Sequence, residues 1–230
     1  MVLGKSVYSI MLANLLKEKN NKILIIDFDV LNNSLHTILE VKKYPEKIKK
    51  IINENVSFEE INTQNLAIKI NKKIDLISGI NLIFNSKNKI EEKELKNSLK
   101  NIFKDYNYVI IDTTSECFFR YTKEIINMSD ICFFITEANL SEISKSKRLL
   151  EIYSKDWNVD DNKIKIIFNK FNKNSIDIKL LKKIYFDYEI IGKIKLKNNY
   201  NDFLNKKSKL IDCKNKIINL LENNKIKIIN

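Results

Sequence analysis

A Gly-Lys-Ser triplet near the amino terminus is the first candidate for chemistry in this sequence. Gly4, Lys5 and Ser6 are followed by VYSIMLANLLKEK, whose apolar spacing favours a helix. Gly-Lys-Ser before a helix is the second half of a phosphate-binding P-loop, G-x-x-x-x-G-K-[ST]. In such a loop the backbone N–H groups and the helix N-terminus bind phosphate oxygens, while the lysine reaches the phosphates and the hydroxyl holds Mg²⁺. The triplet alone recurs in many proteins, so it needs support from the rest of the chain.

Polar residues also stand at the ends of apolar runs that are typical of buried strands. Asp27 and Asp29 close ILIIDFD, Asp112 closes YVIID, and Asn169 closes IKIIFN. Ligands bind at the carboxyl ends of the strands in open α/β sheets, so these four side chains are candidate site residues. A single aspartate there often serves only as the N-cap of the next helix. Four such side chains at three strand ends, together with Gly-Lys-Ser, favour a binding site.

The elements that must position these residues alternate between strands and helices. Apolar runs predict strands at residues 23–29, 66–70, 74–78, 108–112, 131–136, 164–169 and 189–194. Amphipathic stretches predict helices at residues 7–19, 30–56 with a break at Tyr44-Pro45, 90–104, 118–127, 140–155, 176–185 and 200–223. This alternation predicts an α/β fold with three layers, in which helices cover both faces of a mostly parallel sheet. We expect the strands at 23–28, 108–112, 131–136 and 164–168 to lie in the interior of that sheet, within a single domain spanning residues 1–230.

Composition narrows the protein class. The chain has 230 residues with only 3 glycines and 1 proline, so long disordered linkers are not expected. No run approaches the length of a membrane span, and no signal-peptide pattern is present. The three cysteines form no C-x-x-C pair and their odd number argues against a disulfide framework. We therefore expect a cytoplasmic protein, with peripheral attachment to the inner face of the membrane left open.

The formal net charge of +12 raises the question of a nucleic-acid partner. All but two of the 41 basic residues are lysines, the exceptions being Arg120 and Arg148. Sites that read bases favour arginine because its fork bonds two acceptors at once. The abundance of Lys, Asn and Ile also fits an AT-rich coding sequence. Specific DNA reading is disfavoured, and a weak, non-specific attraction to DNA or to an anionic membrane surface stays open.

Taken in order along the chain, these segments resemble the ParA/MinD family of P-loop ATPases, and within it the CpaE/TadZ-like branch. The resemblance covers nearly the whole chain, and it rests on LGKSVYSIMLANLL, ILIIDFDVLNNSLHTIL, YNYVIIDTTSE, MSDICFFITEANLSEISKSKRLL, IKIIFNK and EIIGKI. Each segment is unspecific by itself, whereas their order and spacing are family-like. The resemblance implies the P-loop NTPase fold and two cofactors, ATP and Mg²⁺.

The resemblance also implies roles for individual residues. Lys5 would neutralise phosphate charge, Ser6 would bind Mg²⁺, Asp27 would support Mg²⁺-bound water, and Asp29 would orient the attacking water. Asp112 would be the Walker B carboxylate beside the metal.

For the base, the resemblance assigns Asn169 to the adenine ring. The residues at 169–172 are Asn-Lys-Phe-Asn. A guanine site of the N-K-x-D kind would need a carboxylate where Asn172 stands, so ATP is favoured over GTP.

The sequence departs from the family pattern at its start. In the family, a central strand and a glycine-rich loop precede the residue that corresponds to Gly4, and here Met1-Val2-Leu3 stands in that place. We therefore expect the first strand to be missing through an N-terminal truncation. A degenerate family member that binds nucleotide poorly is the alternative.

Three functions follow from the resemblance. The main hypothesis is an ATPase that forms a homodimer when ATP is bound and positions or helps assemble a cellular structure of the pilus or secretion type. The first alternative is a non-hydrolysing scaffold that retains the fold with a degenerate P-loop. The second is a partition ATPase that binds DNA non-specifically. The partner complex is not encoded in any motif.

Overall fold

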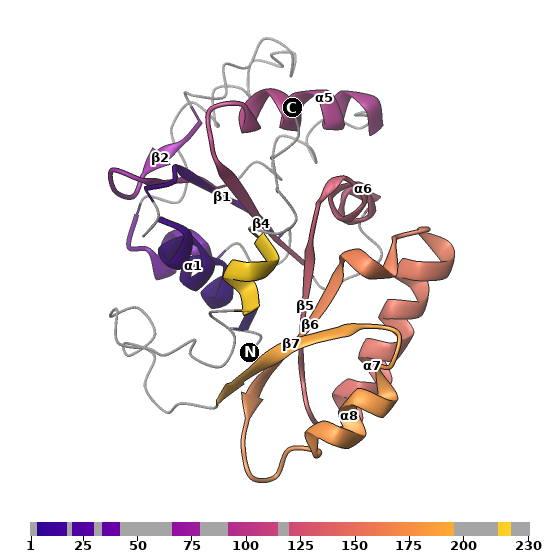
Figure 1. Ribbon diagram of the computed structural model, residues 1–230. Coiled ribbons are helices and arrows are strands. Elements are labelled where there is room, and N and C mark those ends of the chain that lie inside the picture. Colours follow the sequence, from indigo (N-terminus) through magenta and orange to yellow (C-terminus); the bar gives the residue numbers. More distant parts are fainter. Residues whose placement is uncertain are drawn as a thin grey trace. The chain divides into compact units, whose positions relative to one another are not determined.

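The computed structural model describes residues 4–17, 20–29, 34–41, 66–78, 92–114, 120–195 and 216–221 (Figure 1). Its contacts divide the chain into two compact units. The first comprises Met1–Glu116 with Lys227–Asn230, and the second comprises Cys117–Ile226. The expectation of a single domain stays a prediction, and we describe each unit by itself.

The first unit is built on a four-stranded sheet in the order β2-β3-β1-β4. Its strands are β1 (Ile23–Phe28), β2 (Ile68–Lys69), β3 (Ile74–Ser78) and β4 (Tyr108–Thr113). Strand β1 runs parallel to both β3 and β4, and only the short β2 is antiparallel to its neighbour. Every residue of β1 is buried, as expected for an apolar run covered on both faces. The sheet therefore carries the carboxyl ends of three parallel strands at one edge.

Helices of the first unit pack around this sheet. Helix α1 (Gly4–Lys17) lies against β1 and β4, and ten of its fourteen residues are buried. The short helix α2 (Leu35–Ile38) follows β1, and α5 (Glu92–Phe103) precedes β4. Helix α1 starts three residues earlier than predicted, so the Gly-Lys-Ser triplet forms its first turn.

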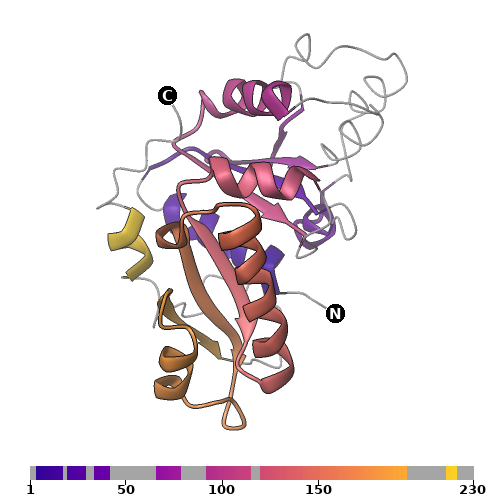
Figure 2. The same ribbon diagram turned by 90° about the vertical axis from the view of Figure 1, so that its right-hand side faces the viewer.

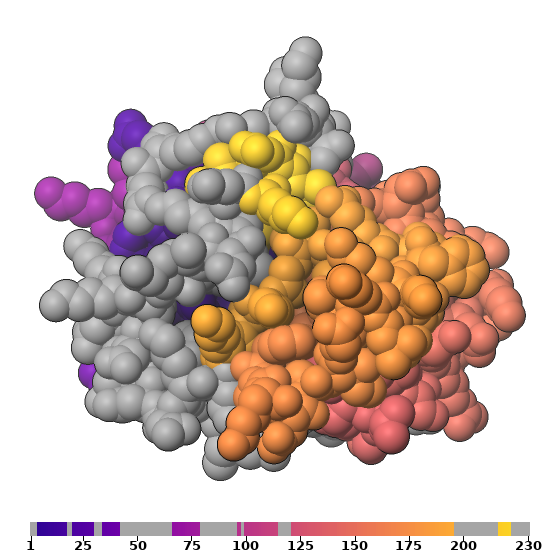
Figure 3. Space-filling model, turned by 60° about the horizontal axis from the view of Figure 1, so that its bottom comes forward, coloured from indigo at the N-terminus to yellow at the C-terminus, as the bar shows by residue number. Residues whose placement is uncertain are grey.

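The second unit is built on a parallel three-stranded sheet in the order β5-β6-β7. Its strands are β5 (Cys132–Glu137), β6 (Ile164–Phe171) and β7 (Glu189–Lys195). Its helices are α6 (Arg120–Met128), α7 (Leu140–Glu151) and α8 (Ile178–Ile184), with a π-turn at Ile152–Asp156 and a 3₁₀ turn at Asp161–Lys163. Helices α7 and α8 lie on the same face of the sheet (Figures 1 and 2). Residues of β6, β7 and α8, coloured orange, cover much of one surface of this unit (Figure 3).

A single apolar cluster joins these helices to the sheet of the second unit. Leu150 and Tyr153 from the α7 side, Phe168 from β6 and Leu181 from α8 are all buried in it. The Tyr185 hydroxyl, just past α8, lies 2.5 Å from the Ser146 hydroxyl on α7. Trp157 packs against the same cluster and stacks on Tyr153, with ring centroids 4.8 Å apart. Both helices are thus fixed relative to the carboxyl ends of β5 and β6.

The predicted α/β class with mostly parallel strands is confirmed, while one detail of the sheet is wrong. We expected four strands in the interior of one sheet. In the described residues β1 and β6 are interior strands, but β4 and β5 are edge strands of two separate sheets. Most residues of both edge strands are only half-buried. An apolar run reports that the two faces of a strand are covered, but it carries no information about hydrogen bonding at the strand's edges.

Five of the predicted helices fall close to their ranges, but α2 ends at Ile38, so residues 39–41, which were predicted to be helical, are not. Most of the predicted helices at 30–56 and 200–223 lies outside the described residues. Helix 140–155 is correct in position, although its last turn is a π-turn rather than α-helix. No helix in the described residues is both long enough and apolar enough to cross a membrane.

The packing of the second unit predicts that two adjacent leucines contribute very differently to the free energy of unfolding. Leu181 is fully buried, whereas Leu180 is 50% exposed. We expect Leu181→Ala to lower the free energy of unfolding by about 2–5 kcal/mol, because it removes buried methyl groups and leaves a cavity. Leu180→Ala, the control, should change it by no more than about 0.5 kcal/mol. The measurement is urea unfolding followed by fluorescence of Trp157, the only tryptophan. Equal effects of the two substitutions would contradict the packing described here.

Candidate functional site

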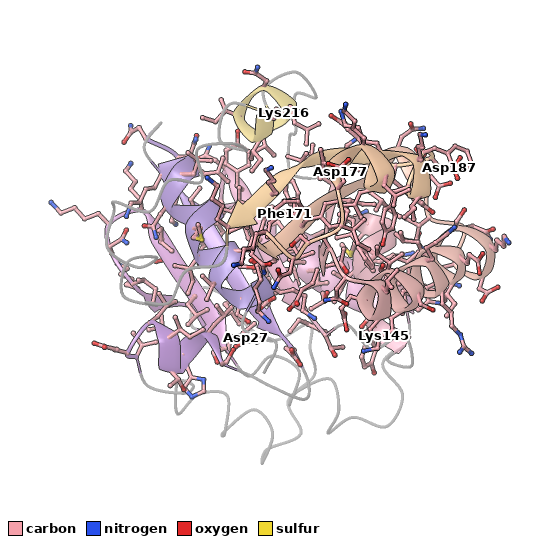
Figure 4. All side chains as sticks on the ribbon, turned by 90° about the horizontal axis from the view of Figure 1, so that it is seen from below. Asp27, Lys145, Phe171, Asp177, Asp187 and Lys216 are labelled. Carbon is pink, nitrogen blue, oxygen red and sulfur yellow. The ribbon has the colours of Figure 1, made fainter. Side chains whose placement is uncertain are left out.

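Three polar side chains lie in a row where the strands of the first unit end. The strand register pairs Asp27 of β1 with Ser78 of β3 on one side and with Asp112 of β4 on the other. Asp27 and Ser78 are fully buried, and Asp112 is 3% exposed. Figure 4 labels Asp27 in this row. Buried polar groups are costly unless hydrogen bonds or charges compensate them, so the partners of the two carboxyl groups are informative.

Asp27 organises the chain that follows β1. The Leu35 N–H donates to Asp27 Oδ2 at 3.0 Å, and the Asp29 N–H donates to Asp27 Oδ1 at 3.4 Å. Burial raises the pKa of Asp27 to about 7, and the negative charges of Asp112 and Asp29 add to the rise, while the two backbone hydrogen bonds oppose it. The side chain therefore fixes the turn after β1 and also shares its surroundings with two other carboxyl groups.

Asp112 connects β4 to the first turn of α1. Burial raises the pKa of Asp112 to about 6, and the negative charge of Asp29 also raises it. A hydrogen bond from Ser6 and the positive charge of Lys5 act in the opposite direction and lower this pKa. Its Oδ2 atom is buried and has no hydrogen-bond partner in the part of the chain that is described. A buried carboxylate oxygen without a donor is suited to a cation or to a water molecule bound to one.

The Gly-Lys-Ser triplet lies at the N-terminus of α1. The first N–H groups of a helix have no partner within the helix, and together with the helix dipole they attract anions. Gly4 and Lys5 are half-buried and Ser6 is buried. The Ser34 hydroxyl donates to Ser6 Oγ at 3.3 Å. This end of the helix thus presents N–H groups, an ammonium group and a hydroxyl beside Asp112.

The structure brings five of the predicted site residues together in the first unit. Asp112 interacts with Lys5, Ser6 and Asp29. Asp27 interacts in turn with Asp112 and Asp29. Asp29 lies just beyond the last residue of β1, so it is not part of the strand that carries Asp27.

The side chains at this site could bind Mg²⁺ only together with ligands from outside the protein, such as phosphate oxygens and water. Among the described residues no group of three or more His, Cys, Asp and Glu side chains could hold a metal ion. Mg²⁺ is usually bound by one or two carboxylates together with phosphate oxygens and water. The Ser6 hydroxyl and the bare Oδ2 of Asp112 fit that pattern, so the residues present suit a metal that arrives with a phosphate.

Asn169 belongs to the second unit and ends the apolar part of β6. Its register partner on β5 is Glu137. Its side-chain amide makes no hydrogen bond to the described residues. Its polar groups are therefore available to a ligand within this unit.

Sequence reasoning missed two serines in the first unit. Ser34 begins α2 but makes no side-chain cap, and its hydroxyl reaches Ser6 instead. Ser78 ends β3 in register with Asp27. Ser78 could have been found from its position at a strand end, as the four candidate residues were. Ser34 lies inside the stretch at 30–44 that was predicted to be helical, so its position at a helix start was not recognised.

The raised carboxyl pKa values predict that stability falls as the pH rises. Between 3.8 and about 7, Asp27 keeps its proton in the folded chain and loses it in the unfolded chain. Unfolding then releases a proton, so the free energy of unfolding decreases up to about pH 7 and levels off above it. Asp112 acts in the same direction up to about pH 6. Asp27→Asn should flatten this dependence, as measured by urea unfolding followed by far-UV circular dichroism.

Asp187→Asn, at an exposed position labelled in Figure 4, is the control and should keep the wild-type slope. A wild-type protein whose stability rose or stayed constant over this pH range would contradict the burial of the two carboxyl groups.

The chain is similar to known proteins along most of its length. A sequence model of the AAA domain family, AAA_31, matches residues 3–140. An uncharacterized ATP-binding protein of Methanocaldococcus jannaschii is 26% identical over 81% of this chain and 82% of its own length. A plasmid partition protein of Borrelia burgdorferi B31, solved with AMPPNP, is 27% identical with a TM-score of 0.66, over 96% of this chain and 93% of that chain.

The fold is shared more widely. A chain of the MinC:MinD cell division protein complex of Aquifex aeolicus has a TM-score of 0.69 at 16% identity, over 94% of this chain and 91% of that chain. At that identity the likeness concerns the fold alone. Because the family model covers more than half of the sequence, the chain belongs to the AAA domain family AAA_31, and its fold is that of the ParA/MinD P-loop ATPases.

Proposed function

We propose that this protein binds ATP with Mg²⁺ and hydrolyses it. The observation that carries the proposal is the grouping of Lys5, Ser6 and Asp29 around the buried carboxyl group of Asp112. An ammonium group, a hydroxyl and helix N–H groups on one side of a carboxyl pair form a surface for a phosphate-bound cation. The AMPPNP complex of the 27% identical partition protein supports the choice of nucleotide.

Phosphoryl transfer of this kind depends on positioning and electrostatics. Lys5 and the N-terminus of α1 would hold the phosphates, and Ser6 with Asp112 would hold the metal. When bound, Mg²⁺ supplies charge neutralisation at the phosphate oxygens. Asp27 would support water on the metal while it anchors Asp29 through the 3.4 Å backbone contact. Asp29, half-buried and just outside the strand, would orient an attacking water.

Asn169 would contact the adenine base. Its amide offers both a donor and an acceptor, as adenine requires. Asn172 is engaged elsewhere, because its side chain donates to the Lys170 carbonyl at 3.0 Å and accepts from the Asn174 N–H at 2.8 Å. A locked amide at this position provides no carboxylate for guanine, which favours ATP over GTP.

The cellular role proposed for the ATPase is to position or help assemble a larger structure. We assign it to the CpaE/TadZ-like branch, acting as an ATP-bound homodimer on a pilus or secretion apparatus. Partition of DNA is the second candidate, which the likeness to the Borrelia partition protein and the net charge of +12 both favour. A scaffold without hydrolysis would keep the fold and lose turnover. Non-specific contact with DNA or an anionic membrane remains a prediction.

Asp29 separates the ATPase from the scaffold. Asp29→Ala should lower ATP turnover by about 10²–10⁴, the size of a general acid–base contribution. ATP binding should persist, because the proposed role of Asp29 concerns the attacking water and not the phosphates. The measurement combines phosphate release with nucleotide binding and with size-exclusion chromatography in the presence of Mg²⁺ and ATP, where a trapped dimer should accumulate.

Asp187→Ala, the control, removes an exposed carboxylate of the second unit and should leave turnover at the wild-type level. Unchanged turnover in Asp29→Ala would remove Asp29 from catalysis. A wild-type protein that binds ATP without turning it over would favour the scaffold.

A further inference from the structure

An ion pair lies beside Asn169 at the carboxyl ends of β5 and β6. Lys170 Nζ contacts Glu137 Oε1 at 2.5 Å, and Glu137 is the register partner of Asn169. Both side chains are only partly exposed, Lys170 at 40% and Glu137 at 36%. The second carboxylate oxygen of Glu137 accepts from Asn139 Nδ2 at 3.4 Å. Both oxygens of Glu137 and the ammonium group of Lys170 are thus engaged within the protein.

The backbone holds this arrangement in an unusual conformation. Lys170 has a φ of 51°, in the left-handed region that non-glycine residues seldom adopt. The register between β6 and β7 shifts between Phe168 and Phe171, so β6 is irregular at this point. Asn172 bonds the Lys170 carbonyl and Asn139 caps α7 by accepting from the Glu142 N–H at 3.0 Å. The ion pair is therefore held in a network of hydrogen bonds, whereas the side-chain amide of Asn169 makes no hydrogen bond to the described residues.

We propose that the Lys170–Glu137 ion pair is a base-selectivity element that withholds from the ligand the two charged groups guanine would use. The inference rests on the proposed nucleotide function and deepens it. Guanine presents two adjacent acceptors, O6 and N7, that a lysine bonds well, and donors on N1 and N2 that a carboxylate accepts. Adenine instead presents a donor beside an acceptor, which the neutral amide of Asn169 matches. Pairing Lys170 with Glu137 neutralises both charges, while the half-buried amide of Asn169, which matches adenine, makes no hydrogen bond to the described residues.

The proposal predicts that single substitutions in the ion pair change the ratio of ATP to GTP affinity, whereas the double substitution does not. Glu137→Gln frees the ammonium group, and Lys170→Met frees the carboxylate. Each single variant should therefore lower the ratio of ATP to GTP affinity about tenfold, the discrimination of one bidentate contact. The double variant removes both charges and should return the ratio to the wild-type value. Lys145→Met breaks the exposed Lys145–Glu142 ion pair on α7 and is the matched control, with no expected change in the ratio. Figure 4 labels Lys145.

The experiment measures equilibrium binding of ATP and of GTP, each with Mg²⁺, to the whole chain and its variants. Breaking a half-exposed ion pair costs at most about 1 kcal/mol of stability, so the variants should remain folded. Restored selectivity in the double variant is a result that a merely structural role of the pair would not produce. Asn169→Ala should weaken ATP binding in the wild-type background.

The binding data distinguish a failure of the proposed nucleotide function from a failure of this inference. If the wild type binds neither nucleotide, the proposed function and this inference both fall. If the wild type prefers ATP and the single variants keep its ratio, only the inference falls. If the single and double variants lose the preference equally, the pair merely shapes the strand ends and the inference is overturned. The inference also falls if Asn169→Ala binds ATP as the wild type does.

Discussion

The burial of two carboxyl groups on neighbouring strands is the constraint on which the first unit depends. Asp27 and Asp112 are register partners at the ends of β1 and β4, and both have raised pKa values because water is excluded from them. Such a pair destabilises a fold unless something compensates it. The backbone donors at Leu35 and Asp29, the Ser6 hydroxyl and the charge of Lys5 provide part of that compensation. Asp112 Oδ2 has no hydrogen-bond partner among the described residues, so compensation is incomplete there, and a phosphate-bound cation would complete it.

In the second unit, packing and hydrogen bonds fix the positions of the polar groups at the ends of the apolar strands. Its buried cluster fixes α7 and α8 on β6. The cap at Asn139 and the bonds of Asn172 then hold the loops that follow β5 and β6. Within that frame Lys170 and Glu137 neutralise each other. An electrically neutral group of side chains beside Asn169, whose amide makes no hydrogen bond to the described residues, is suited to recognise a neutral base rather than a charged group.

The sequence predicted the strands and the polar strand ends well because both are local patterns. ILIIDF and YVIIDT are apolar runs whose length and content leave little alternative to buried strands, and the aspartates stand at their ends. The edge positions of β4 and β5 were not predictable, because no pattern within a strand specifies its neighbours. The Lys170–Glu137 pair joins residues 33 apart and depends on a left-handed lysine. No local sequence pattern predicts either the ion pair or the left-handed conformation of Lys170.

Proton release on nucleotide binding tests the central claim, that the buried carboxyl pair is built to receive a phosphate-bound cation. Calorimetric titration with Mg²⁺·ATP in buffers of different ionisation enthalpy counts the protons released. Near pH 6.5, pKa values of about 7 and about 6 leave about one proton on the pair, and cation binding should expel it. We predict release of about one proton by the wild type and clearly less by Asp27→Asn. Binding of Mg²⁺·ATP with no proton release in the wild type would contradict the account.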